Sequence, residues 1–258
     1  MSKSYFRRNI SRRMKQNILI ISLLLMSTKP TIAQTADPYL WLEDIHGKPS
    51  MDWVNQHNAV TTDLLMKQPE YGKIYDQCLE IMNSTDKIAH PDIQGDYIYN
   101  FWKDKNHERG IWRRALKQSY VSGSPQWETL IDIDQLSKTE GINWSFQSAE
   151  GLFPAYSRFL MHLSQGGGDA NVIREYDPAK KAFIEEGFSL PESKGYVNYL
   201  DDNTLLVARD FGEGTLTTSG YPRQVRLWKR GTDVKDALLI HQGDSTDVMV
   251  RPQVCHTP

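Results

Sequence analysis

Cysteine is scarce in this 258-residue sequence, which contains only Cys78 and Cys255. Two distant thiols cannot form the disulfide framework that stabilises many small secreted domains. The sequence also lacks an H-E-x-x-H motif, and its seven histidines are scattered without the spacing of metal ligands. We therefore expect a fold stabilised by its own hydrophobic core, with neither a metal site nor another cofactor.

Long apolar runs are equally rare. The one candidate, residues 18–26, is shorter than the roughly 20 residues needed to span a bilayer. Basic residues precede it and Thr31, Ile32 and Ala33 follow, which is the order of a secretory signal peptide. The sequence therefore predicts a signal peptide over residues 1–33 and an exported protein, periplasmic or secreted. An uncleaved membrane anchor is the alternative.

An excess of basic residues is also missing from the predicted mature chain. Removing residues 1–33 takes seven of the 30 Lys and Arg and none of the 32 Asp and Glu, which leaves a net charge of about −9. Binding to nucleic acid or anionic membranes needs clustered basic residues. We therefore expect neither as a partner once the signal peptide is removed.

A serine nucleophile is not apparent either. The nearest approach to the G-x-S-x-G motif is residues 187–191, but Pro191 occupies the last position and no helix is predicted to follow. The Gly-rich residues 166–169 lack the Lys-Ser/Thr of a phosphate-binding loop and instead predict a hairpin turn.

Residues 37–58, DPYLWLEDIHGKPSMDWVNQHN, are by contrast rich in acidic, histidine and tryptophan side chains. Glu43 and Asp44 are adjacent, so on a regular element they point apart and cannot act on one substrate atom. Asp52 falls in the first turn of a predicted helix, where its charge favours the helix dipole. A carboxylate-dependent hydrolase built on this stretch is therefore the least favoured interpretation.

Two helices are predicted in the N-terminal part of the mature chain. Ser50 is a plausible N-cap, and Trp53, His57, Val60 and Leu64 recur on one helical face. A second apolar stripe runs over residues 71–82 after Pro69. We expect a helical segment within residues 34–86.

Short strand-like runs then recur with a period of roughly 50 residues, which is typical of four-stranded β-propeller blades. The matching runs are residues 97–104, 158–164 and 204–210; 111–117, 171–177 and 224–230; and 128–134, 181–187 and 236–242, with first strands at 144–148 and 196–200. The sequence predicts a mostly β fold over residues 87–258: about three blades of an incomplete propeller, then the first strand of another blade at residues 247–254. A β-sandwich or barrel with evenly spaced strands is the alternative.

The same residues carry a resemblance to the prolyl oligopeptidase family of serine peptidases. The pattern consists of residues 37–44, Trp53, Val54 and Asn58, followed by residues 99–104, 109–114, 125–130, 166–170, 172–176, 210–212, 219–223 and 228–231. The resemblance implies a propeller joined to an α/β-hydrolase domain with a Ser-Asp-His triad. It also implies cleavage of short peptides, typically after proline, with the propeller restricting access. None of the three triad residues can be placed in this sequence.

The resemblance also implies roles for particular residues. Within residues 34–86, Trp41, Leu42 and Trp53 would dock onto the hydrolase domain, which is the partner that this chain lacks. Residues 210–223 are the longest predicted inter-strand loop, and Asp210, Phe211, Tyr221 and Arg223 are the candidates for a substrate-gating loop. The alternative is an ordinary solvent-exposed connection.

Two function hypotheses follow. In the first, the chain is the N-terminal, substrate-gating propeller portion of an exported prolyl-oligopeptidase-like serine endopeptidase that hydrolyses short, proline-containing peptides; without the triad, the chain by itself is inactive. In the second, it is a secreted non-catalytic propeller module whose ring is completed by a partner chain, because unpaired strand edges invite a partner.

Overall fold

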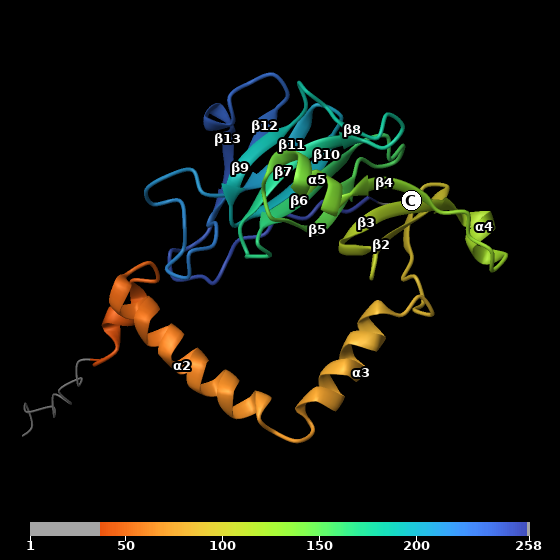
Figure 1. The fold of residues 1–258 in the computed structure, drawn as a ribbon. Helices are drawn as coiled ribbons and strands as arrows, with labels where there is room; N and C mark the ends of the chain where they lie inside the picture. Colours follow the sequence, from red (N-terminus) through yellow and green to blue (C-terminus); the bar gives the residue numbers. More distant parts are fainter. Residues whose placement is uncertain (1–36, 257–258) are drawn as a thin grey trace, which may run out of the picture. The chain divides into compact units, whose positions relative to one another are not determined.

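The computed structural model describes residues 37–256 (Figure 1). The predicted signal peptide lies outside these residues. The chain divides into two compact units, residues 1–72 and 73–258, which are described separately. No helix in the described range combines the length and the apolar content that crossing a bilayer requires.

The first unit contains a short 3-10 helix, η1 (Leu40–Glu43), and the helix α2 (Lys48–Met66). The predicted N-cap at Ser50 is wrong. Gly47 caps α2 and Pro49 lies in its first turn, because proline lacks the N–H that would be unsatisfied there. Ser50 is buried instead, and its Oγ donates a hydrogen bond to the carbonyl of Trp41 at 2.8 Å, which ties η1 to α2.

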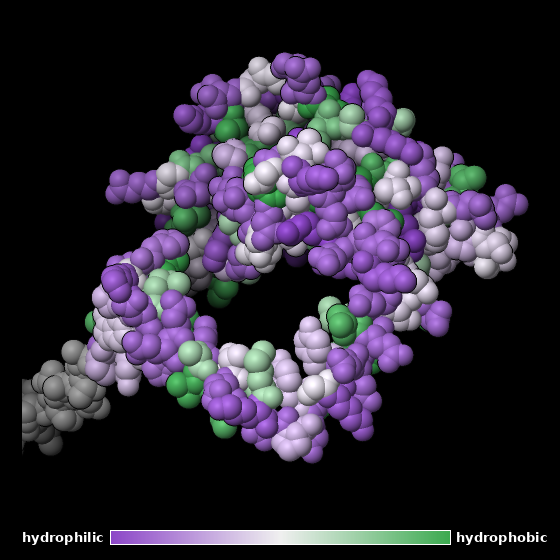
Figure 2. All heavy atoms as spheres, viewed as in Figure 1, coloured by the Kyte–Doolittle hydropathy of each residue, from purple (hydrophilic) through white to green (hydrophobic). Residues whose placement is uncertain are grey.

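The helix α3 (Tyr71–Asn83) follows, and both predicted helices are therefore present. Their apolar side chains are largely exposed: Val60 is 70 % exposed and Leu64 61 % in α2, and Met82 is 69 % exposed in α3. Figure 2 shows hydrophobic residues among the exposed side chains along α2. Amphipathic helices normally bury such a stripe, so these faces are suited to packing against another surface.

The second unit contains three antiparallel sheets, each formed by strands that follow one another along the chain. The first, blade 1, has the order β1 (Asp92–Gln94), β2 (Tyr97–Asp104), β3 (His107–Leu116) and β4 (Glu128–Asp132). Blade 2 has β5 (Trp144–Gly151), β6 (Phe159–Gln165), β7 (Asn171–Asp177) and β8 (Ala182–Phe183), with β9 (Ser189–Ser193) also paired to β7. Blade 3 has β10 (Tyr196–Asp201), β11 (Thr204–Ala208), β12 (Gln224–Lys229) and β13 (Leu238–Gln242). Short helical elements connect them: α4 (Lys117–Val121), α5 (Ile133–Glu140) and η2 (Val234–Asp236).

The predicted three-blade repeat is confirmed, with corrections at some boundaries. The predicted strand at residues 128–134 ends at Asp132, because the Asp132 carboxylate accepts a hydrogen bond from Gln135 N and caps α5. The run at residues 181–187 is reduced to β8, and β9 provides the additional pairing to β7. The predicted turn at residues 166–169 does join β6 to β7.

The predicted first strand of another blade, residues 247–254, is wrong: the segment forms no strand. A strand requires a ladder of backbone bonds to a neighbouring strand. This segment instead makes isolated bonds to the loop before β12. Val250 N donates to the Pro222 carbonyl at 2.8 Å, and Thr217 Oγ1 donates to the Val248 carbonyl at 3.1 Å.

An aromatic cluster fills the space between blades 1 and 2. Tyr99 stacks on Trp112 with ring centroids 5.1 Å apart, and Phe159 lies 4.9 Å from both rings. Tyr176 is also buried here, and its hydroxyl donates a hydrogen bond to the Leu130 carbonyl of blade 1. These large alternating strand residues explain why neighbouring sheets pack face to face.

A second, mainly aliphatic cluster joins blades 2 and 3. It combines Ile173 and Leu190 of blade 2 with Leu205 and Val207 of blade 3, all at most 3 % exposed. The buried Trp228 of β12 packs against Phe188, with ring centroids 4.9 Å apart. Both clusters bury side chains contributed by two sheets, so each blade completes the core of its neighbour.

An ion pair is set into this second interface. The Glu175 side chain of β7 is fully buried, and Arg230 donates to its two oxygens at 2.7 and 2.8 Å. The Tyr199 hydroxyl of β10 and Phe188 N donate to the same carboxylate at 2.8 and 3.0 Å. Four donors therefore satisfy one buried carboxylate and connect blade 2 to blade 3.

Replacing Glu175 by glutamine is expected to destabilise the second unit by about 3 kcal/mol, because it leaves the Arg230 guanidinium in the interface without its counter-charge. Urea unfolding of the purified chain measures the change. Glu186→Gln, which changes an exposed carboxylate on the loop before β9, is the matched control and should alter the free energy of unfolding by less than about 0.5 kcal/mol. Equal effects of the two variants would contradict a role for the buried pair.

The stability of this unit should also depend on pH through Glu175. Burial raises the pKa of the carboxyl, but the hydrogen bonds from Arg230, Phe188 N and Tyr199 outweigh burial and leave the pKa below its ordinary value. The unfolded chain then binds this proton first as the pH falls, so the stabilisation is present above the unfolded pKa of about 4.3 and is lost below it. We expect the difference in unfolding free energy between wild type and Glu175→Gln to shrink as the pH falls below about 4. A constant difference from pH 6 to pH 3 would contradict this.

Candidate functional site

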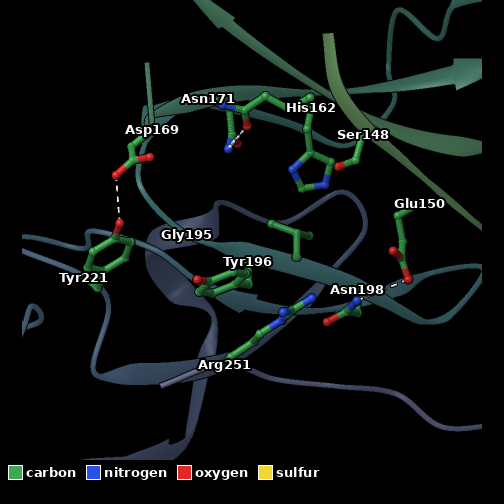
Figure 3. A pocket seen from close by; sticks show the side chains of 12 residues that line it. Ser148, Glu150, His162, Asp169, Asn171, Gly195, Tyr196, Asn198, Tyr221 and Arg251 are labelled. Carbon is green, nitrogen blue, oxygen red and sulfur yellow. Dashed lines mark hydrogen bonds between the residues drawn. The ribbon is translucent and has the colours of Figure 1, made fainter. Parts of the chain in front are cut away.

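A polar cavity of about 300 Å³ lies between the first strands of blades 2 and 3 (Figure 3). β5 and β10 lie next to each other, and among the strands of residues 37–256 β5 pairs with β6 alone and β10 with β11 alone. In propellers the blades surround a central channel. The cavity is lined by Gln147, Ser148, Glu150, His162, Asp169, Asn171, Gly195, Tyr196, Val197, Asn198, Tyr221 and Arg251.

Asp169 and Tyr221 form one wall of this cavity. The Tyr221 hydroxyl donates a hydrogen bond to Asp169 Oδ2 at 2.7 Å, and Lys194 Nζ lies 3.6 Å from the same oxygen. The hydrogen bond from Tyr221 and the charge of Lys194 lower the pKa of Asp169, and the same hydrogen bond raises the pKa of Tyr221. The contact joins the β6–β7 turn to the loop between β11 and β12.

A buried polar network supports the cavity from beneath. Arg209 is 3 % exposed and donates to Asn171 Oδ1 at 3.0 Å and to the Pro191 carbonyl at 2.6 Å. Asn171 in turn donates to Gln147 Oε1 at 2.8 Å. Burial, together with the charge of Arg209, lowers the pKa of His162 to about 4. His162 is therefore neutral at physiological pH and contributes polarity without charge.

The other end of the cavity is formed by Glu150, Tyr196, Asn198 and Arg251. Asn198 Nδ2 donates to Glu150 Oε1 at 3.2 Å, and the Arg251 guanidinium lies 5.0 Å from the centre of the Tyr196 ring. Figure 3 shows the Arg251 side chain extending toward Asn198.

No catalytic arrangement is evident in this cavity among the described residues. Ser148 faces His162 in the β5–β6 register, but no hydrogen bond joins their side chains, and a histidine with a pKa near 4 is a weak base at neutral pH. Within residues 37–256 no group of three His, Cys, Asp or Glu could hold a metal ion. The arrangement instead presents hydrogen-bond donors and acceptors at fixed positions.

Of the four predicted gating residues, the structure places only Tyr221 at the cavity. Asp210 accepts a hydrogen bond from Gly212 N at 2.8 Å within its own loop. Phe211 is half-buried against the core of blades 2 and 3, with the Arg226 guanidinium 4.2 Å from its ring. Arg223 Nε donates to the Gly243 carbonyl at 3.0 Å. The gating function of the loop stays a prediction.

The three predicted docking residues lie together in the first unit. The Trp41 and Trp53 rings meet edge to face with centroids 6.4 Å apart, and Trp53 stacks on His57 at 3.9 Å. Trp41 is 40 % exposed, Trp53 is 36 % exposed and Leu42 is half-buried. Two ordered tryptophans with this exposure form a surface suited to docking.

Sequence reasoning missed most of the cavity. Its residues come from β5, β6, β7 and β10, from the β6–β7, β9–β10 and β11–β12 loops and from the segment after β13, and no local pattern links Glu150, Asn198 and Arg251. One signal was available: Arg209 ends the apolar run Leu205–Ala208, where a charged residue predicts either the strand end or a buried polar contact.

Comparisons with known proteins identify the fold. Residues 27–254 match the family model described as the prolyl oligopeptidase N-terminal β-propeller domain. An uncharacterized peptidase of Sinorhizobium fredii is 44 % identical over 214 residues, which cover 83 % of this chain and 30 % of that protein. A prolyl endopeptidase of Elizabethkingia miricola is 33 % identical over 156 residues, covering 59 % of this chain and 20 % of that protein.

The solved structure of a post-proline cleaving enzyme from Rickettsia typhi superposes with a TM-score of 0.74 at 29 % identity. The match covers 81 % of this chain and 31 % of the Rickettsia chain. This chain thus spans less than a third of the length of the relatives it resembles. On the family match and the three sequential antiparallel sheets, the chain belongs to the prolyl oligopeptidase family and carries its N-terminal β-propeller domain.

Proposed function

We propose that this chain is the N-terminal, substrate-gating portion of an exported prolyl-oligopeptidase-like serine endopeptidase that hydrolyses short, proline-containing peptides. The observation that carries the proposal is the family match over residues 27–254, together with relatives named as peptidases and prolyl endopeptidases. Catalysis then depends on a hydrolase domain, because the 258 residues contain no G-x-S-x-G motif to supply a nucleophile.

The exposed surface of the first unit supports the proposal that a separate hydrolase domain docks onto this chain and performs catalysis. Trp41 and Trp53 form an ordered aromatic surface, and the apolar side chains of α2 remain exposed. A hydrolase domain that covers this surface would remove it from water, at about 25 cal/mol per Å² of apolar area. In this proposal the first unit acts in docking and the blades act in limiting access to the active site.

A secreted binding module completed by a partner chain is the second candidate. It is favoured by β13, in which Leu238, Leu239 and Ile240 are each between 46 and 65 % exposed. An edge strand with such side chains is a surface for another sheet. The two candidates differ in whether the completed assembly cleaves peptides.

The chain alone is expected to release no product from a fluorogenic Gly-Pro-linked peptide. A chimera in which it replaces the matching region of the Rickettsia typhi enzyme is expected to cleave the same peptide, because the hydrolase domain then supplies the triad. Fluorescence release measures both, and the unmodified Rickettsia enzyme is the positive control. Cleavage by the chain alone that a serine-directed phosphonate blocks would overturn the proposed inactivity. A folded but inactive chimera would favour the binding-module candidate.

Trp53→Ala is expected to weaken docking in that chimera by about 2 kcal/mol, because tryptophans near the centre of an interface contribute a large share of its energy. The measurements are kcat/KM and the unfolding midpoint of the chimera. Gln56→Ala, on the same helix, is the control, and its effect on docking should be below about 0.5 kcal/mol, with kcat/KM and the unfolding midpoint close to those of the parent chimera. Indistinguishable chimeras would contradict the docking role.

A further inference from the structure

The strongest unassigned feature is the end of the cavity that contains Arg251. Among the residues that line the cavity, Arg251 carries the permanent positive charge, because His162 is neutral at physiological pH. None of the ion pairs within residues 37–256 involves Arg251. Its guanidinium instead lies against the Tyr196 ring, a contact that leaves the planar donors of the guanidinium available.

The backbone around Arg251 is held in place on both sides. Val250 N donates to the Pro222 carbonyl at 2.8 Å, and the Val248 carbonyl accepts hydrogen bonds from the Thr217 and Ser219 hydroxyls at 3.1 and 2.8 Å. On the other side, Pro252 is buried. The guanidinium is therefore presented to the cavity from an anchored segment, which lowers the entropy cost of using it in binding.

A second group in the same cavity has an unused hydrogen-bonding atom. Asn198 Oδ1 is buried and has no hydrogen-bond partner, although Asn198 Nδ2 is occupied by Glu150. Buried acceptors are nearly always satisfied in folded proteins, and an external donor can satisfy this oxygen when the side chains that cover it move aside. A peptide N–H is such a donor, and the guanidinium is the complement of a carboxylate.

We propose that this cavity is a subsite for a peptide that carries a carboxylate: the carboxylate binds Arg251, and a neighbouring backbone N–H donates to Asn198 Oδ1. The inference rests on the proposed function for the origin of the peptide, since a peptidase propeller meets peptides in its channel. The carboxylate can belong to an acidic side chain or to the C-terminus of the peptide. A volume of about 300 Å³ accommodates a side chain and part of a backbone.

Two carboxylates of the protein, Asp169 and Glu150, also line this cavity. Asp169 already accepts from Tyr221 and lies near Lys194. Glu150 accepts from Asn198 and is exposed to solvent. Glu150 should therefore oppose an incoming carboxylate weakly, while Arg251 attracts it. Arg251 favours a negatively charged ligand and Glu150 favours a positively charged one, so the affinities of acidic and basic peptides distinguish the two roles.

The test measures binding of capped peptides to the full 258-residue chain by titration calorimetry at low ionic strength. The probes are acetyl-Gly-Gly-Xaa-Pro-Gly-Gly-amides with Glu, Gln or Lys as Xaa, and the Gln peptide with a free C-terminal carboxylate. The Glu peptide is expected to bind about 10-fold more tightly than the Gln peptide, as for one charge-assisted contact. If only the free-carboxylate Gln peptide gains this advantage, the C-terminus is the source of the carboxylate, and the subsite is supported in that form.

The variants separate the proposed contact from general electrostatics. Arg251→Gln should abolish the advantage of the carboxylate peptides, Arg251→Lys should retain part of it, and Glu150→Gln should increase their affinity. Arg158→Gln, which removes a guanidinium from a separate cavity, is the control for net charge and should change little. The inference is overturned if the Lys peptide binds best and Glu150→Gln weakens its binding, or if Arg251→Gln leaves every affinity unchanged.

These outcomes are independent of the proposed peptidase function. Binding is measured without hydrolysis, so Arg251-dependent binding by a chain whose chimera is inactive would support the subsite and count against the peptidase. If the chimera is active and Arg251→Gln changes neither its cleavage rate nor peptide binding, the proposed peptidase function is supported and the proposed subsite is contradicted.

Discussion

The buried carboxylate of Glu175 is the constraint on which the arrangement of blades 2 and 3 depends. A charge without exposure to water is tolerated only when donors surround it, and here they come from Arg230, Tyr199 and the backbone of Phe188. Because these donors belong to both sheets, the two blades cannot shift relative to each other without leaving the charge unsatisfied. The hydrophobic core packs around these donors, and the ion pair joins the two sheets within it.

The cavity lies between the same two blades. β5 and β10 come into contact only because blades 2 and 3 pack in this way, and their adjacent edges bring Glu150 next to Asn198. Arg209 then fixes the base of the cavity through Asn171. The stability of this interface and the geometry of the cavity are therefore connected: the core positions two strands, and these strands position the polar groups of the cavity.

The helical unit follows a different logic. Its sequence pattern forms α2 as expected, but the resulting apolar face has no core of its own to cover it. Local forces are sufficient for the contact between Trp41 and Trp53 and for the bond from Ser50 that joins η1 to α2. This exposed apolar face can stabilise the protein only when another surface covers it. The proposed function therefore assigns it to docking onto a hydrolase domain.

The sequence by itself determined the periodic features: the helices around Trp53 and after Tyr71, the three sheets, the turn at residues 166–169 and the family resemblance. Each depends on interactions between residues close in sequence, or on a repeat that can be counted. Only the tertiary structure decided that β9 pairs with β7, that residues 247–254 form no strand and that Tyr221 reaches Asp169. It alone also brought Asn198 and Arg251 into one cavity. These contacts join residues far apart along the chain, and which of the possible pairings forms is decided by the burial of polar groups and the packing of whole sheets rather than by local preference.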